Sequence, residues 1–126
     1  MQKDIENRAD IQRFVDQFYG QAKVDPVIGY IFMEVADLNW ETHMPRIYDF
    51  WEMVLLGNIV FDGNPMLKHI QLDRKERLMP EHFTRWIALF CETIDQLFAG
   101  KIADLAKTRA RSIGGLMQHK LAAVRK

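Results

Sequence analysis

One histidine of this sequence lies in a setting that suits a ligand to a cofactor metal. A turn at residues 63–65 leads into a short segment where the neighbours of His69 are apolar, namely Met66, Leu67, Ile70 and Leu72. An apolar setting penalises the charged imidazolium, and neutral imidazole is the commonest nitrogen ligand of metals. His69 is therefore either a buried side chain with a hydrogen-bond partner or the residue that holds a cofactor.

Three further side chains combine an apolar body with a polar tip. His43 heads the aromatic face of one expected helix, while Tyr19 and Trp86 lie on the apolar stripes of two others. A buried tyrosine hydroxyl or tryptophan N–H needs a partner, and helical bundles build cofactor sites between facing helices. These side chains are either core residues with satisfied polar tips or the walls of one cavity shared with His69.

Most signatures of catalysis are absent from the sequence. It has no glycine-rich phosphate loop, no His-Glu-x-x-His motif and no nucleophile elbow. Ser112 is the only serine and falls within an expected helix, while Cys91 falls near an apolar helix face, where it is expected to pack. His82 and His119 are expected at the surface. Histidines and aromatic residues therefore carry whatever chemistry the chain has.

The elements that must position these residues are helices. A first helix is predicted from an N-cap at Asn7 to a point before Pro26, since apolar residues recur at three- and four-residue steps. A second amphipathic stripe covers residues 47–55. Proline is tolerated only in the first helical turn, so Pro45 predicts that this helix begins near Thr42 or His43.

The second half of the chain predicts two more long helices. One starts at Pro80 and is closed by Gly100, and the other runs over residues 102–124. Residues 58–61 have strand-like composition but no partner strand, so they are expected to form an apolar loop, and residues 73–77 a charged connector. The prediction is an all-α protein with one domain spanning residues 1–126.

Composition excludes several classes of protein. The 17 basic and 17 acidic residues balance, so no overall charge draws the chain to nucleic acid or to an anionic membrane. The longest apolar run, residues 53–61, is too short to span a bilayer, and residues 1–6 contain no signal core. The single cysteine suits a reducing compartment. A soluble cytoplasmic protein is expected.

The order of the motifs resembles a known family. Phe18-Tyr19, Asp25-Pro26 and Gly29-Tyr30-Ile31-Phe32 are similar to the opening of a truncated haemoglobin. Four later motifs resemble its group III branch: Trp40-x-x-His43, Asp49-Phe50-Trp51, the Gly63-Asn64-Pro65 turn before His69, and Phe83-x-x-Trp86-x-x-Leu89-Phe90. The resemblance covers residues 8 to 122 and implies the truncated globin fold, a two-over-two helical sandwich with a haem pocket.

The resemblance also implies roles for individual residues. His69 matches the proximal histidine that binds the iron of haem b. Tyr19 and Trp86 match distal donors to an iron-bound ligand, and His43 matches a distal histidine that gates the pocket or contacts the ligand. The residues that match the pocket wall or contact the cofactor are Phe32, Ile47, Phe50, Trp51 and Met66. Charge and position suggest Arg46, Lys68 and Arg74 for the haem propionates.

Two functions follow from this resemblance. The first is redox chemistry on NO or reactive oxygen species by a protein that binds O₂, NO and CO, releases O₂ slowly and needs an electron donor or reductase. Such an activity would be NO dioxygenase-like or peroxidase-like. The second is O₂ storage, transfer or sensing without turnover. Periodicity alone leaves a third possibility, a helical interaction protein whose aromatic residues only fill a core.

Overall fold

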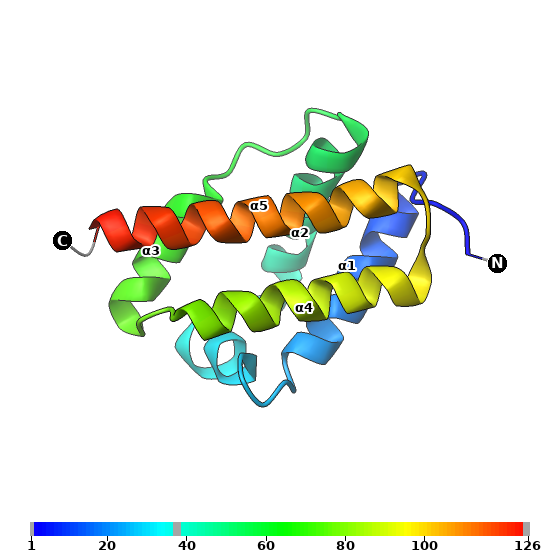
Figure 1. The fold of residues 1–126 in the computed structure, drawn as a ribbon. Coiled ribbons are helices and arrows are strands. Elements are labelled where there is room, and N and C mark those ends of the chain that lie inside the picture. The colour runs from blue at the N-terminus through cyan, green and yellow to red at the C-terminus, as the bar shows by residue number, and fades with distance from the viewer. Residues whose placement is uncertain (1, 37–38, 125–126) are drawn as a thin grey trace.

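The computed structural model describes residues 2–36 and 39–124 and consists of helices joined by short connections (Figure 1). The helices are α1 (Arg8–Ala22), the short π-helix η1 (Ile31–Val35), α2 (Trp40–Leu56), α3 (Pro65–Lys75), α4 (Pro80–Leu97) and α5 (Lys101–Val124). No strand occurs within the described residues. The all-α prediction is confirmed.

Two helix pairs form the framework. α4 and α5 lie side by side and run in opposite directions, and α1 packs against both α2 and α4 (Figure 1). The core between them is aromatic: Phe14, Phe18 and Phe90 are fully or almost fully buried. The arrangement is the two-over-two sandwich that the family resemblance implies. α3 stands apart from these pairs and contacts the C-terminal half of α5. Ile70 and Leu72 of α3 pack against a cluster that includes Met117 and Leu121 of α5.

Side-chain caps begin α1, as predicted, and also α3, which was not predicted as a helix. The Asn7 carboxamide oxygen accepts the Asp10 N–H at 3.0 Å, and that of Asn64 accepts the Leu67 N–H at 3.1 Å. Proline at the first position of α3 and of α4 loses no helical hydrogen bond there. Residues 57–64 form a loop, and Gly57, with φ of 76°, ends α2 in the left-handed region that glycine favours.

Three boundaries differ from the prediction. α2 begins at Trp40, not near Thr42 or His43, so Pro45 lies inside the helix. The Asn39 side chain caps the Glu41 N–H at 3.1 Å and offsets the one backbone bond that Pro45 removes. The charged connector also starts later than predicted, because α3 continues to Lys75. α4 ends at Leu97, three residues before Gly100.

Gly29 allows the corner after α1 to close tightly. A Cβ atom at this position would lie 2.7 Å from the backbone oxygen of Lys23. Because backbone cannot move aside as a flexible side chain can, Gly29→Ala should destabilise the fold by about 1–3 kcal/mol. Gly20→Ala is the matched control: this exposed helical glycine has nothing within 4 Å of the added Cβ, so the change should stabilise by roughly 0.5–1 kcal/mol. Urea denaturation of both variants tests this, and shifts of the same sign would contradict it.

A buried ion pair ties the same corner to α4. The Asp25 carboxylate is almost completely buried, accepts the Val27 and Ile28 N–H groups at 3.0 and 3.1 Å, and meets Arg85 Nη2 at 2.7 Å. The hydrogen bond from Arg85 holds the pKa of Asp25 below its usual range. The stabilisation is therefore present above the ordinary Asp pKa of about 3.9 and is lost as the pH falls through the lower folded value.

We expect Asp25→Asn to lower the free energy of unfolding by roughly 1–3 kcal/mol near neutral pH, discounted because Arg85 is partly exposed. The gap between the wild-type and variant proteins should start to narrow near pH 4, where Asp25 of the unfolded chain takes up a proton. It should close as the pH falls through the lower pKa of the folded protein. Urea denaturation across this pH range measures the gap. A gap that stays constant down to about pH 2 would show that the charge of Asp25 contributes nothing.

None of the helices in residues 2–36 and 39–124 is long and apolar enough to cross a membrane.

Candidate functional site

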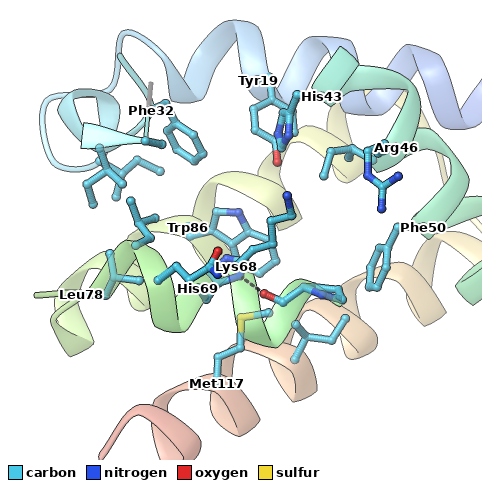
Figure 2. A pocket seen from close by; sticks show the side chains of 18 of the residues that line it. Tyr19, Phe32, His43, Arg46, Phe50, Lys68, His69, Leu78, Trp86 and Met117 are labelled. Atoms are coloured by element: carbon cyan, nitrogen blue, oxygen red, sulfur yellow. Dashed lines mark hydrogen bonds between the residues drawn. The ribbon is translucent and has the colours of Figure 1, made fainter. Parts of the chain in front are cut away.

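A cavity of about 670 Å³ lies between the helix pairs and α3, within the size range of small-molecule and cofactor sites. α1, η1 and α2 line it from one side and α3 from the other, while α4 and α5 also contribute (Figure 2). Most of the lining is apolar, and none of its described residues is aspartate or glutamate. The cavity is therefore suited to a large apolar group.

His69 lines this cavity from α3 with one ring nitrogen already engaged. Its Nδ1 lies 2.7 Å from the Pro65 carbonyl oxygen, one helical turn earlier. A carbonyl only accepts, so Nδ1 carries the proton and Nε2 keeps its lone pair. Burial lowers the pKa of His69, which favours the neutral ring. The helix thus fixes the tautomer that a metal ligand requires.

Tyr19 and His43 face the cavity from the side opposite His69 (Figure 2). Their rings meet edge to face, with centroids 5.7 Å apart. The Tyr19 hydroxyl points into the cavity and has no hydrogen-bond partner among the described residues (Figure 2). Burial raises the pKa of Tyr19 far above its ordinary value, so the hydroxyl keeps its proton and remains a donor. The alternative that its tip is satisfied within the protein core is wrong for the described residues.

His43 carries an unsatisfied polar atom. Its Nε2 is buried and lacks a partner in the described part of the chain. Burial lowers the pKa of His43, and the nearby Lys68 charge lowers it further. A buried polar atom without a partner costs free energy unless a ligand or water satisfies it. Although Pro45 is only two residues away, the helix that starts at Trp40 still directs His43 at the cavity.

Aromatic stacking positions Trp86. Its ring stacks on Phe90 at a centroid distance of 5.6 Å, and Phe90 in turn stacks on Trp51 at 4.8 Å. Phe18 meets Trp86 edge to face at 6.0 Å. The indole N–H has no hydrogen-bond partner among the described residues. Trp86 therefore offers a second donor on a ring that packing holds in place.

Most other predicted site residues also lie in the cavity lining, which includes Phe32, Arg46, Ile47, Phe50, Trp51 and Lys68. Phe32 belongs to η1 and meets Tyr19 edge to face at 5.5 Å. Arg46 lies 3.9 Å from Asp62 and over the Phe61 ring. Arg74 is exposed and does not line the cavity, which does not support its predicted place at the propionates. The side chain of Met66 lies outside the described part of the structure.

Two lining residues were not anticipated. Lys75 lies seven residues after Lys68 on α3, a spacing that puts both on one helix face at the cavity edge.

His82, expected at the surface, is half-buried and lines the cavity. Its Nδ1 accepts the Met79 N–H at 2.9 Å, so its Nε2 carries a proton and donates to the Tyr30 hydroxyl at 3.2 Å. The signal in the sequence was its third position in α4, where side chains reach back to the cap.

These features fit a haem. One cavity wall offers an imidazole lone pair, the opposite wall offers uncommitted polar groups, and the lining between them is apolar. Arg46, Lys68 and Lys75 are the lining cations available to the two propionates. The chain therefore brings together a histidine nitrogen that could hold the iron, polar groups on the opposite wall and cations at the cavity edge.

Comparisons with known proteins bear on the fold and the family resemblance, although no family model matches the sequence. A solved structure, the crystal structure of group III truncated hemoglobin from Campylobacter jejuni, superposes with a TM-score of 0.82 at 26% identity, over 96% of this chain and 95% of that one. The chain has the truncated globin fold.

The sequence comparison leads to the same branch. The group 3 truncated hemoglobin of Campylobacter jejuni subsp. jejuni is 28% identical over 118 residues, which cover 91% of each chain. The resemblance to the group III truncated haemoglobins is confirmed in both sequence and fold. Such a globin-type protein implies a haem cofactor and gaseous ligands.

Proposed function

We propose that the chain holds haem b through His69 Nε2 and binds O₂, NO and CO on the side of Tyr19, Trp86 and His43. One observation carries the proposal: His69 donates its Nδ1–H to the Pro65 carbonyl, which leaves the lone pair of Nε2 free on a cavity wall. A haem iron with a single neutral imidazole ligand has one coordination position open for a diatomic gas.

The residues of the chain then act on the gas ligand. Tyr19 O–H and Trp86 N–H donate to a ligand that gains negative charge on binding, and they do so where water is largely excluded. Such bonds slow the release of O₂, which suits chemistry on the bound ligand better than oxygen delivery. We propose the net oxidation of NO by O₂ to nitrate, with one electron supplied by a reductase, or a related reaction of peroxide.

Absorption spectra of the purified chain test haem binding. We expect a Soret band that shifts on dithionite reduction and again with CO, recovered by adding haem to the haem-free chain. No band after haem addition would overturn the proposal and favour a helical domain whose aromatic residues only fill a core.

Mixing the O₂-loaded protein with NO separates turnover from storage. The proposal predicts rapid NO consumption with one nitrate formed per NO. The Tyr19→Phe variant should lose O₂ faster and leave more NO unreacted. Slow reaction with NO, combined with reversible O₂ exchange, would instead favour the alternative of storage, transfer or sensing. The single cysteine is consistent with a cytoplasmic location, which we include in the proposal.

A further inference from the structure

Basic residues from two distant parts of the sequence gather at one end of the molecule. We call this the basic end surface and define it by its four members: Arg74, Lys75, Arg77 and Lys120. All four are exposed, and none has an ion-pair partner within the described residues. The chain as a whole is neutral, so this gathering is local.

The fold brings the two segments together. α3 lies beside the C-terminal half of α5 (Figure 1). Leu78 and Leu121 pack into the same apolar cluster, and Arg77 and Lys120 are their immediate neighbours in the sequence. Two acidic residues lie beside the basic ones in the sequence, and Asp73 is engaged as acceptor of the Leu78 N–H at 2.8 Å. Glu76 is the other, so positive charge predominates at this end.

This surface adjoins the helix that carries His69. Lys68 and Lys75 line the cavity edge, whereas Arg74, Arg77 and Lys120 lie outside it and are not needed to hold a cofactor. Lys75 is six residues from His69, about 9 Å along the helix axis. Electron transfer falls steeply with distance, so a carrier docked here would approach the site from its proximal side.

We propose that the basic end surface docks an acidic electron-carrier protein, which returns the haem iron from ferric to ferrous. The inference rests on the proposed function and names the reductant that it requires. One electron leaves the reduced flavin or iron–sulfur centre of the carrier and reduces one ferric iron; no atom is transferred. Complementary charge speeds such encounters, and redox complexes are small and transient, so a few exposed cations suffice.

The test uses the full haem-loaded chain with purified flavodoxin, an acidic flavoprotein, as probe. The surface variant combines Arg74→Glu, Arg77→Glu and Lys120→Glu. The control variant makes the same change of net charge elsewhere on α5, through Lys101→Glu, Arg109→Glu and Arg111→Glu, all at exposed positions.

Stopped-flow measurements follow reduction of the ferric protein by reduced flavodoxin at about 0.01 M and about 0.15 M ionic strength. Between these two conditions the screening length falls from roughly 30 Å to roughly 8 Å. Calorimetry measures flavodoxin binding to the loaded and the haem-free chain.

We expect the surface variant to lower the second-order rate roughly tenfold or more at low ionic strength, and the control variant by less than about threefold. Flavodoxin binding should weaken in the same order, and dithionite should reduce all three proteins equally. Equal losses in both variants, or no loss in either, would overturn the proposal. Sedimentation with anionic lipid vesicles tests the other possible occupant. A surface variant that keeps the wild-type flavodoxin rate but loses vesicle binding would also overturn the proposal. Absence of a Soret band would count against the proposed function instead, because calorimetry on the haem-free chain still tests the surface.

Discussion

Replacing Tyr19 with phenylalanine and Trp86 with leucine together should raise the O₂ dissociation rate of the haem-loaded protein by at least about tenfold, since hydrogen bonds contribute about 1 kcal/mol each and 1.4 kcal/mol is a factor of ten. Both polar groups face the cavity without a partner among the described residues. Bonds to a ligand that carries partial charge are stronger than neutral ones. Each single variant should therefore show part of the increase.

Stopped-flow displacement of O₂ by CO measures this rate. Tyr48→Phe is the matched control, because the Tyr48 hydroxyl donates to Asp16 and lies outside the cavity lining. Its O₂ dissociation rate should equal that of the wild type. If the double variant released O₂ at the wild-type rate, Tyr19 and Trp86 would not be donors to the ligand.

Replacing His69 with glycine should weaken haem binding by more than about 100-fold, since loss of a mere supporting hydrogen bond to a metal ligand already costs 10–100-fold. The variant leaves a space where the ring was, so added imidazole should enter and restore the Soret band. Transfer of haem to an excess of apomyoglobin measures the affinity. His119→Gly, an exposed histidine on α5, is the control and should retain haem as the wild type does. Unchanged haem retention in His69→Gly would remove His69 as the axial ligand.

Local rules predicted much of the fold. Asn7 is a cap and Pro80 stands at a first helical position, as predicted. α3, with its cap at Asn64 and Pro65 at its first position, was not predicted as a helix. The start of α2 was predicted too late because of Pro45. The rule that proline belongs in the first turn counts the N–H that proline lacks, but not the compensating cap that Asn39 makes to the Glu41 N–H. The π-helix η1 has no comparable signal in the sequence. Its residues pack against distant parts of the chain, Phe32 against Tyr19 and Ile31 in the cluster of Phe83 and Met117.

Spacing put the candidate residues on apolar helix faces, and the family resemblance implied their roles. What the sequence could not predict depends on tertiary structure. The faces that carry Tyr19, His43 and Trp86 follow from helical periodicity, and all three line one cavity. The partner of His69 Nδ1 follows from the turn before it, because the Pro65 carbonyl is four residues earlier. Arg74 and Lys75 could not be told apart by charge; only the course of α3 puts Lys75 at the cavity and Arg74 outside it.

The central claim is that His69, rather than His43, is the axial ligand of the haem iron, and resonance Raman spectroscopy of the ferrous, ligand-free protein tests it most directly. The account predicts an iron–histidine stretching band that shifts when histidine is labelled with nitrogen-15. The band should persist in His43→Ala and disappear in His69→Gly until imidazole is added. A band that persists in His69→Gly but is lost in His43→Ala would contradict the account.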